Sequence, residues 1–156
     1  AALFRNIAQP LVTALSTSSS AATLPVSMDA AQNRFRVSSE VSSVVLPLGA
    51  TVNMDGTALF EGVAAVFLAQ MFGIALDPIT ITTIFLVAMM ASIGAPGIPS
   101  GSMAGMQLVL LAVGIPLEAI ALLLMIERPL DTFRTAVNVQ GDLVGSLVVN
   151  KRVTLQ

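Results

Sequence analysis

The sequence predicts an all-α protein that lies in a membrane and contains two re-entrant helical hairpins and two long, broken transmembrane helices. Apolar residues make up 55% of the 156 residues and charged residues only 10%, whereas a soluble domain carries about 25% charged residues. The mean hydropathy is +0.89. Gly, Pro and Ser repeatedly interrupt the apolar segments, and the last segment carries a line of charged side chains. The expected environment is therefore the lipid bilayer.

The composition also excludes several functional classes. The net charge is −2 and there is no basic patch, so nucleic acid is not an expected partner. The chain has no Cys and no His, which removes disulfides, thiol catalysis, histidine general bases and most transition-metal sites. No nucleophile–base pair is apparent, and we expect that the protein is not an enzyme. Trp and Tyr are absent, so the aromatic belt typical of a bilayer interface is missing.

The first hairpin is predicted at residues 1–33. Residues 7–15 are apolar but too few to span a bilayer, which takes about 20 residues. The Ser-rich residues 16–20 interrupt this segment, and residues 21–31 continue as a second short helix. Two short apolar arms around a polar tip indicate a re-entrant hairpin, and a soluble helix–loop–helix is the alternative. Residues 29–40 are the most polar stretch and predict an aqueous connector.

A broken transmembrane helix is predicted at residues 41–76. Residues 41–52 are apolar, residues 53–57 (Asn-Met-Asp-Gly-Thr) interrupt them, and residues 58–76 are long enough to finish a span. We expect Gly56 to let the backbone turn. The side-chain and main-chain oxygens freed at this point can bind a hard monovalent cation. A helix kink with a capping Asp is the alternative.

A second hairpin is predicted at residues 78–114. Asp77 and Pro78 form a turn and a helix start, and residues 94–102 contain too much Gly and Pro for a regular helix. Short or interrupted apolar segments that occur in pairs are typical of a secondary transporter with its site near the bilayer midplane. Irregular backbone at that depth is tolerated only where protein or a water-filled cavity satisfies its polar groups.

The last transmembrane helix is predicted at residues 116–150 and carries a polar stripe. At about 100° per residue, its polar residues share one face and apolar residues fill the opposite face. The polar set is Glu127, Asp131, Arg134, Thr135, Asn138 and Asp142, and the apolar set is Leu130, Phe133, Ala136, Val137, Val139 and Val144. Such a stripe is costly in lipid, so it normally faces protein or a water-filled cavity and marks a substrate or ion path. A purely structural salt bridge between Asp131 and Arg134 is the alternative.

Four motifs occur in a specific order. Residues 46–59 read LPLGATVNMDGTAL and residues 131–142 read DTFRTAVNVQGD. The Ser-rich tip that runs to Pro25 and residues 91–99 (ASIGAPGIP) are the other two. Together they resemble the seventh transmembrane segment, the last helix and the two re-entrant hairpins of the glutamate transporter family, the dicarboxylate/amino acid:cation symporters. The resemblance covers nearly the whole of residues 1–156 and implies the C-terminal part of that family's transport domain.

The resemblance also implies further parts of the protein. Members of the family have six transmembrane segments before this part, and the fixed trimer scaffold lies there. The present sequence begins without Met and without a signal peptide. We therefore expect a missing N-terminal scaffold half and a homotrimer in the full-length protein.

The resemblance implies a binding pocket for an acidic amino acid. Arg134 would pair with the distal carboxylate, which suits its planar fork of donors, and Asp131 would hold the α-ammonium. Thr135 and Asn138 would hydrogen-bond the carboxylates, and backbone and hydroxyl groups at the first hairpin tip would hold the α-carboxylate. The other residues of the implied pocket are Ser19, Ser20, Met54, Thr57, Ile98 and Ser102.

The resemblance further implies that sodium ions are co-transported. The first site would comprise backbone of Gly49, Asn53 and Asn138 and the carboxylate of Asp142. The second would comprise carbonyls of Thr51, Ser92, Ile93 and Ala95. A third would use Asn53 and Asp55 together with residues of the missing half.

Glu61 lies inside an apolar helix past the interruption. A carboxyl without a partner at such a place favours its protonated form and can carry a proton. Its position resembles that of the glutamate that eukaryotic acidic amino acid transporters use for proton coupling, where sodium-only archaeal relatives have glutamine. A neutral Glu with a local hydrogen bond is the alternative.

Two features depart from the family pattern. Transporters of acidic amino acids usually have a second arginine near the pocket, at the positions of Ser18 or Thr132 here, and Arg128 is a candidate to replace it. Ser102 stands where some relatives have glycine, which would narrow the pocket. The exact substrate is therefore left open by the resemblance.

The function predicted is sodium-coupled symport of aspartate or glutamate, with proton coupling through Glu61, by a multi-pass protein of the cell membrane. Within the family, a C4-dicarboxylate or neutral amino acid symporter is the alternative. A substrate-binding half without transport of its own is another. The absence of Cys and the close motif match favour a bacterial inner membrane.

Overall fold

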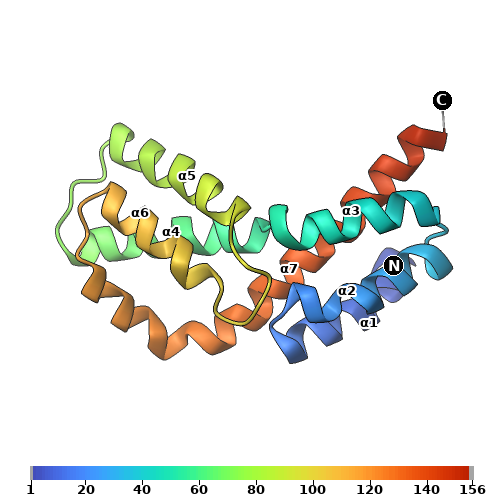
Figure 1. Cartoon of the computed structure of the whole chain (residues 1–156). Helices are drawn as coiled ribbons and strands as arrows, with labels where there is room; N and C mark the ends of the chain where they lie inside the picture. Colours follow the sequence, from blue (N-terminus) through green and yellow to red (C-terminus); the bar gives the residue numbers. More distant parts are fainter. Residues whose placement is uncertain (1, 155–156) are drawn as a thin grey trace.

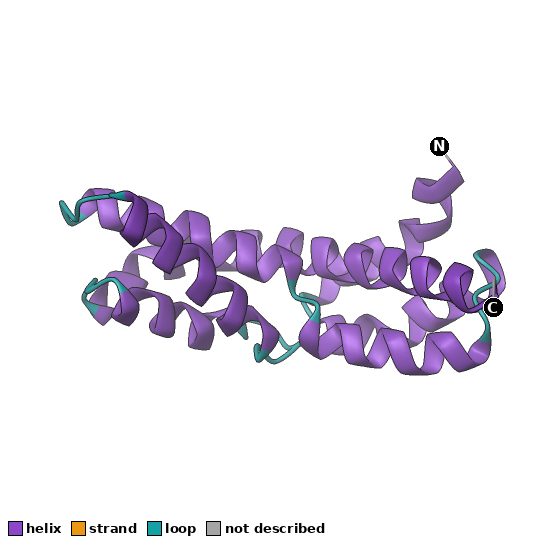
Figure 2. Ribbon diagram, turned by 90° about the horizontal axis from the view of Figure 1, so that it is seen from above, coloured by secondary structure: helices purple, strands orange, loops and turns teal. Residues whose placement is uncertain are grey.

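A computed structural model of the chain describes residues 2–154, which contain helices but no strand (Figures 1 and 2). The all-α prediction is therefore confirmed. Residues 1, 155 and 156 of the predicted range 1–156 lie outside the described residues. The helices are α1 (Ala2–Thr17), α2 (Ser20–Asp29), the π-helical turn η1 (Ala30–Arg34), α3 (Ser39–Val52), α4 (Asp55–Met71), α5 (Pro78–Ile93), α6 (Ser102–Ala112), the short 3-10 helix η2 (Leu117–Ala119) and α7 (Ile120–Thr154).

Helix α7 runs along the whole elongated molecule and organises the packing (Figure 1). In one half it packs against α4 and α6, and in the other half against α1, α2 and α3. The loops gather at the two ends and at the middle of the molecule (Figure 2). The middle group comprises the irregular segments that interrupt the apolar helices.

Helices α1 and α2 form the first hairpin, and the length of each is less than the thickness of a bilayer's hydrocarbon core. The 16 residues of α1 extend over about 24 Å at 1.5 Å per residue, against a hydrocarbon core of about 30 Å. Ser18 turns the chain with a φ of 49°. The hydroxyl of Ser19 caps α2 by accepting a hydrogen bond from the Ala22 N–H, as is typical of serine at a helix start.

The connector after this hairpin is shorter than the sequence predicts. Most of residues 29–40 are helical, because α2 continues directly into Ala30–Arg34 and α3 begins at Ser39. The hydroxyl of Ser38 caps α3 by accepting from the Val41 N–H, and the backbone N–H of Ser38 donates to the side-chain oxygen of Asn150 in α7. The backbone N–H of Ser38 is thus satisfied by the protein rather than by water.

Helices α3 and α4 are two halves of one long helix. Their combined span, Ser39–Met71, has 33 residues and contains an 18-residue window with a mean hydropathy of 1.3, so it is long and apolar enough to cross a membrane. The interruption lies at Asn53 (φ −101°, ψ 74°) and Met54 (φ −103°, ψ 58°), which leave the helical region. Helix α4 ends before the predicted residue 76, because Gly73 turns the chain with a φ of 69°.

The prediction that Gly56 forms the turn is wrong. Gly56 lies within the first turn of α4, and its φ is not positive. A Cβ atom at this position would lie 2.4 Å from the backbone oxygen of Arg134. The glycine is therefore needed for close packing of α4 on the backbone of α7 rather than for backbone freedom.

Helices α5 and α6 form the second hairpin. The Asp77 carboxylate caps α5 by accepting a hydrogen bond from the Thr80 N–H at 2.7 Å, and this bond holds the pKa of Asp77 below its ordinary value. Pro78 follows at the helix start, where its missing N–H leaves no bond unmade. Residues 94–101 form an irregular tip in which Ser100 has a φ of 60°.

The polar face of α7 is buried, as the stripe predicts. Each of the six polar residues of the stripe is at most 6% exposed. On the other face Phe133 is 65% and Val137 is 44% exposed. Val139 is an exception to the predicted apolar outer face, because it packs in a core cluster with Leu143 and Ile7. The helix also continues to Thr154, beyond the predicted end at residue 150.

Each half of the molecule has its own apolar core. One includes Leu68, Ile84 and Met106 from α4, α5 and α6, and the other includes Ile7 and Leu46 from α1 and α3. Many large apolar side chains outside these cores remain exposed. Such a surface suits contact with lipid or with further protein segments.

We expect Gly56→Ala to lower the free energy of unfolding by about 1–3 kcal/mol, because the added methyl group meets backbone rather than a movable side chain. Gly62→Ala in the same helix is the matched control, since nothing lies within 4 Å of its Cβ position. There we expect no loss, or a gain of about 0.5–1 kcal/mol from helix propensity. Thermal unfolding of the two variants in detergent measures both effects, and equal stability would contradict the packing role of Gly56.

Candidate functional site

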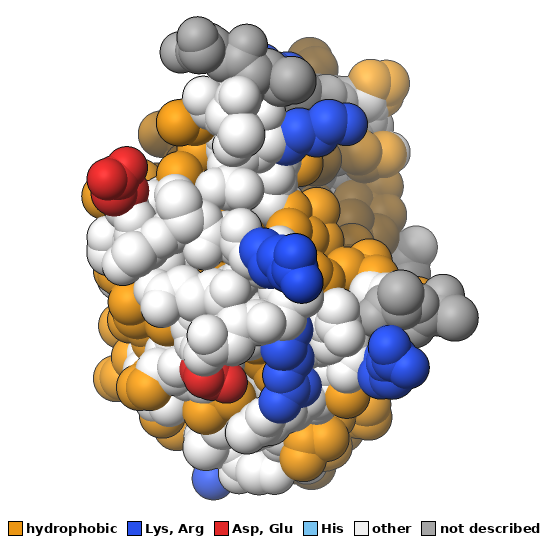
Figure 3. All heavy atoms as spheres, turned by 90° about the vertical axis from the view of Figure 1, so that its right-hand side faces the viewer, with side chains coloured by type: hydrophobic (Ala, Val, Ile, Leu, Met, Phe, Trp, Pro, Cys, Tyr) orange, Lys and Arg blue, Asp and Glu red, His pale blue; other side chains and the backbone are white. Residues whose placement is uncertain are grey.

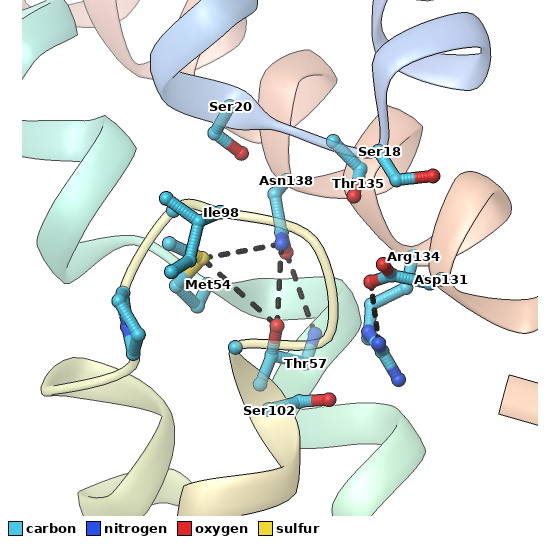
Figure 4. A pocket seen from close by; sticks show the side chains of 13 residues that line it. Ser18, Ser20, Met54, Thr57, Ile98, Ser102, Asp131, Arg134, Thr135 and Asn138 are labelled. Atoms are coloured by element: carbon cyan, nitrogen blue, oxygen red, sulfur yellow. Dashed lines mark hydrogen bonds and ion pairs between the residues drawn. The ribbon is translucent and has the colours of Figure 1, made fainter. Parts of the chain in front are cut away.

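A cavity lies at the middle of the molecule, between the two hairpin tips, the interruption of α3 and α4, and the polar face of α7 (Figure 4). Its volume is about 10 Å³, room for about one water molecule. The lining residues are Ser18, Ser20, Met54, Thr57, Pro96, Gly97, Ile98, Gly101, Ser102, Asp131, Arg134, Thr135 and Asn138. Every residue of the expected substrate pocket except Ser19 is among them.

The guanidinium group of Arg134 is the only basic side chain in this lining, and it is buried and paired. Its Nη2 atom donates to Asp131 Oδ1 and lies 2.9 Å from Glu127 Oε1. The ring of Phe60 in α4 covers it at 4.4 Å from the ring centroid, within range of a cation–π interaction. The alternative of a salt bridge within α7 is thus present in the geometry, with Glu127 as an additional partner.

Glu127 has a partner that the residue pattern does not predict. The pattern places Glu127 on the polar face of the last helix but predicts no role for it. In the structure its carboxylate is 2% exposed and pairs with Arg134 seven residues later. The signal was its spacing, two turns before Arg134 on the same helix face. Its burial beside a cation could have been inferred from that spacing.

Asp131 also connects α7 to the second hairpin. Its Oδ2 atom accepts a hydrogen bond from the Ser100 N–H at 2.9 Å. Ser100 reaches this position with a left-handed φ of 60°, a strained conformation for a residue other than glycine. The carboxylate of Asp131 is therefore shared between Arg134 and the tip of residues 94–101.

Asn138 forms hydrogen bonds with the residues at the interruption between α3 and α4. Its side-chain oxygen accepts a hydrogen bond from the Gly56 N–H at 2.7 Å, and its Nδ2 atom donates to Met54 Sδ and Thr57 Oγ1 (Figure 4). Helix α4 has no side-chain cap of its own, so α7 supplies the cap from outside. This places Asn138, Met54 and Thr57 on one wall of the cavity.

The two hairpin tips are joined by hydrogen bonds. The Gly97 carbonyl oxygen accepts from the Ser19 hydroxyl at 2.8 Å and from the Ala21 N–H at 3.1 Å. A Cβ atom on Gly97 would lie 2.7 Å from the Ala50 carbonyl oxygen, so only glycine fits there. Ser19 therefore caps α2 and holds the opposite tip instead of lining the cavity.

The first expected sodium ligands lie together behind the interruption. The Asn53 side-chain amide donates to Asp142 Oδ1 at 3.0 Å. Cβ positions on Gly49 and Gly141 would lie 2.4 Å from Asp142 Oδ1 and 2.5 Å from Asp55 Oδ2, respectively. The backbone therefore approaches both carboxylates closely. Such oxygen donors suit a hard cation. The described residues contain no group of three His, Cys, Asp or Glu side chains that could hold a metal ion, so a cation at this position would also need backbone oxygens.

The second expected sodium set is divided between two helix ends. Ser92 and Ile93 lie in the last turn of α5, Ala95 follows it, and Thr51 lies in the last turn of α3. Ser92 and Ala95 are buried, whereas Thr51 and Ile93 are exposed. Carbonyl oxygens at the end of a helix lack helical partners, so the end of α5 offers acceptors at this position.

Glu61 is completely buried, and neither carboxyl oxygen has a hydrogen-bond partner among the described residues. The local hydrogen bond of the alternative interpretation is thus not found. A Cβ atom on Gly105 of α6 would lie 2.3 Å from Glu61 Oε1. The carboxyl group therefore lies directly against the backbone of the second hairpin.

Comparison with known proteins identifies the family. The family model described as "Sodium:dicarboxylate symporter family" matches residues 1–152. The chain belongs to this family. The chain is therefore part of a membrane protein, and its resemblance to the glutamate transporter family is confirmed.

Its relatives among curated proteins are named as transporters. Excitatory amino acid transporter 2 of Mus musculus is 50% identical over 146 residues, which cover 94% of this chain and 26% of the relative. For Excitatory amino acid transporter 3 of Mus musculus the identity is also 50%, and the match covers 94% of the chain and 28% of the relative. A Caenorhabditis elegans Excitatory amino acid transporter is 45% identical, with 93% and 29% covered. The chain thus spans about a quarter of the length of these relatives.

Arg128 does not supply a second arginine to the cavity. It is exposed and does not line the cavity. Thr132 donates to the Pro129 carbonyl oxygen and is also outside the lining. Ser18 does line the cavity, so it is the one expected position of a second arginine that faces the site.

We expect Arg134→Gln to lower the free energy of unfolding by about 3–5 kcal/mol, because it leaves the carboxylates of Glu127 and Asp131 buried without a cation. The same change at the exposed Arg128 is the matched control, and we expect it to alter stability by no more than about 0.5 kcal/mol. Thermal unfolding in detergent distinguishes the two. A small effect at Arg134 would mean that the buried ion pairs contribute little to the fold.

Proposed function

We propose that the full-length protein is a secondary active transporter that couples the movement of sodium ions to the uptake of aspartate or glutamate. The observation that carries the proposal is the pairing of Arg134 and Asp131 in one cavity that also receives both hairpin tips. The relatives' names and the family description support the same function. Catalysis has no part in it.

The chemistry of the cavity suits an amino acid with two carboxylates. A substrate carboxylate can replace Asp131 or Glu127 as a partner of Arg134, and the released Asp131 can then hold the ammonium group. Thr135 and Asn138 supply neutral hydrogen-bonding groups beside them. The first tip offers Ser20 and the backbone N–H groups at the start of α2, where a carboxylate is favoured by the helix dipole.

Neighbouring residues connect this pocket to the proposed cation sites. Met54 lines the cavity. Asn53, directly before it, donates a hydrogen bond to Asp142 at the first proposed sodium site. A sodium ion held by Gly49, Asn53 and Asp142 would fix the backbone of the interruption and so the position of Met54. Ligands that favour the same backbone conformation raise each other's affinity reciprocally. Sodium and substrate would be coupled in this way.

The second hairpin tip is proposed as the gate. The cavity of about 10 Å³ is far too small for an amino acid, so residues 94–101 have to move when substrate enters. Few hydrogen bonds join this tip to other elements: the Ser100 N–H donates to Asp131, and the Gly97 carbonyl accepts from the first tip. Closure with sodium and substrate both bound, followed by movement of the whole domain across the membrane, would complete transport.

Proton coupling is proposed to involve Glu61. Its carboxyl group is buried without a hydrogen-bond partner and lies against Gly105 of the gate hairpin. A charged carboxylate would be strongly disfavoured there, so the closed gate favours a bound proton. The proton would leave when the second hairpin moves and water reaches the group.

The remaining proposals concern the parts outside this chain. We propose that it acts with an N-terminal scaffold half in a homotrimer, in a multi-pass protein of the cell membrane. Exposed apolar side chains such as Phe133, Ile79 and Met125 are consistent with further protein or lipid around it. The bacterial inner membrane is retained as a proposal on the absence of Cys, although the relatives named above are animal proteins.

A C4-dicarboxylate or neutral amino acid symporter is the alternative within the family. Neutral substrates would not provide Arg134 with a carboxylate, and plain dicarboxylates would not provide Asp131 with an ammonium group. A substrate-binding half without transport of its own is a third possibility. It is distinguished by binding of substrate in the absence of uptake.

The test is calorimetric binding of L-aspartate to the full-length protein in detergent, with sodium and then with choline in its place. We expect binding in sodium only. Uptake of radiolabelled L-aspartate into proteoliposomes, driven by a sodium gradient, tests transport itself. Binding without uptake would favour the third possibility, and binding of succinate or L-serine but not L-aspartate would favour the symporter alternatives.

We expect Asp131→Asn to abolish detectable binding of L-aspartate, because the ammonium group loses its counter-charge in a site with little water. Arg134 keeps Glu127 as a partner in this variant, so the protein should still fold and show a thermal transition. Unchanged L-aspartate affinity in a folded Asp131→Asn sample would refute the assignment of the ammonium site.

We expect Glu61→Gln to remove the dependence of uptake on a proton gradient while sodium-driven binding is kept. Glutamine has nearly the same shape and cannot release a proton at neutral pH. Uptake into proteoliposomes with and without an imposed pH gradient measures the effect. If the parent protein itself shows no response to the gradient, sodium alone is coupled and Glu61 is a structural residue.

A further inference from the structure

Basic side chains gather at one end of the molecule, where α1 begins, η1 leads into α3, and α7 ends (Figures 1 and 3). Five of the seven Lys and Arg residues of the chain belong to these segments, and all five are exposed. We call them the basic end: Arg5, Arg34, Arg36, Lys151 and Arg152. The linear sequence shows no basic patch because these residues come from separate segments, and the folding of the chain forms one.

The basic end carries a net positive charge. Its segments also contain the exposed carboxylates of Asp29 and Glu40, so five positive and two negative side chains leave a net charge of +3. Among the described residues, both ion pairs involve Arg134 in the middle of the molecule, so no carboxylate there neutralises the basic end. The loops at the opposite end contain Asp77 and Glu118 but neither Lys nor Arg. The two ends therefore differ in the sign of their charge.

The basic end borders exposed apolar surface. Phe4, directly before Arg5, is 63% exposed, and Val153, directly after Arg152, is 55% exposed. In membrane proteins, long basic side chains lie where the apolar surface ends, because their stems cover apolar atoms while the charge reaches the headgroup region. An excess of Lys and Arg is typical of the cytoplasmic side, where the leaflet contains anionic lipids. The location of the charges therefore suits contact with lipid headgroups.

Arg36 occupies a position that favours glycine. Its φ of 56° lies in the left-handed region, which is costly for a residue with a Cβ atom and not for glycine. The turn itself is closed by backbone, since the Val37 N–H donates to the Ala31 carbonyl oxygen. Arg34 is different, because its guanidinium donates hydrogen bonds to α1. The Arg36 side chain has no such partner in the described chain, which leaves it available to an external anion.

We propose that the basic end binds the phosphate groups of anionic phospholipids in the cytoplasmic leaflet of the membrane. The planar donors of arginine match phosphate oxygens, and basic residues near an anionic membrane surface contribute to binding together. A phospholipid fits better than free phosphate, because its acyl chains can cover the exposed apolar side chains beside the cations, such as Phe4 and Val153. The proposal concerns a surface away from the cavity, and it does not depend on which substrate is transported.

The test is the affinity of the full-length protein in detergent for dioctanoyl-phosphatidylglycerol, obtained from the rise in melting temperature as lipid is added. Dioctanoyl-phosphatidylcholine is the control with the same acyl chains and no net charge, and inorganic phosphate is the control without acyl chains. We expect phosphatidylglycerol to raise the melting temperature more than either control. We expect the rise to become smaller in about 0.5 M choline chloride at constant sodium, because salt screens exposed charges.

Three substitutions remove charges that have no partner in the described chain: Arg36→Gly, Lys151→Gln and Arg152→Gln. We expect each to raise the Kd for phosphatidylglycerol by about 5-fold, and all three together by about 100-fold. Arg36→Gly should also leave the melting temperature of the lipid-free protein unchanged or raised, since glycine relieves the left-handed backbone. The matched control is Arg128→Gln, because Arg128 is exposed but lies outside the basic end. That variant should keep the Kd of the parent.

The outcomes decide between lipid binding and simpler explanations. An equal rise in melting temperature with phosphatidylcholine would overturn the proposal, because the charge would have no part in binding. An equal rise with inorganic phosphate would also overturn it, because the surface would then bind an anion and not a lipid. A triple variant that binds phosphatidylglycerol as tightly as the parent would show that the basic end is not the site. None of these measurements uses L-aspartate, so the proposed transport function stands or fails separately.

Discussion

The positive charge of Arg134, buried in the middle of an apolar chain, has to be neutralised by groups in direct contact, and several elements of the fold meet that requirement. Glu127 and Asp131 pair with it from α7, and Phe60 of α4 covers its face. The remaining oxygen of Asp131 then binds the tip of the second hairpin through Ser100. One guanidinium group thereby connects α4, α7 and the irregular loop around the cavity.

The need to give every buried polar group a partner also explains which residues surround the interruption between α3 and α4. Breaking a helix frees N–H and C=O groups that apolar surroundings cannot satisfy. Asn138 of α7 accepts from the first turn of α4, and Asn53 turns its side chain to Asp142 on the other side. One side of the interruption thus faces the cavity, and the other side faces the carboxylates of Asp55 and Asp142. A change on either side alters the same short piece of backbone, which is the physical basis proposed for coupling.

Much of the candidate site follows from residue spacing, because helix periodicity alone determines that Asp131, Arg134 and Asn138 share a face. Their burial then follows from the cost of charge in lipid. The role of Gly56 could not be obtained in this way, since close contact with the Arg134 backbone depends on how two helices pack. The hydrogen bond of the Ser19 hydroxyl could not be obtained from spacing for the same reason. Its partner is the Gly97 carbonyl, which lies 78 residues away in the sequence.

The sequence by itself determined the class of protein, the order of hairpins and broken helices, the polar face of the last helix and, through its motifs, the family. These depend on composition, local periodicity and the positions of Gly, Pro and Ser, which are properties of neighbouring residues. The tertiary structure decided which polar groups have partners. It paired Arg134 with Glu127, capped α4 with Asn138, and left Ser102 and Glu61 without hydrogen bonds. Such pairing depends on distances between elements far apart in the chain, and only packing establishes those distances.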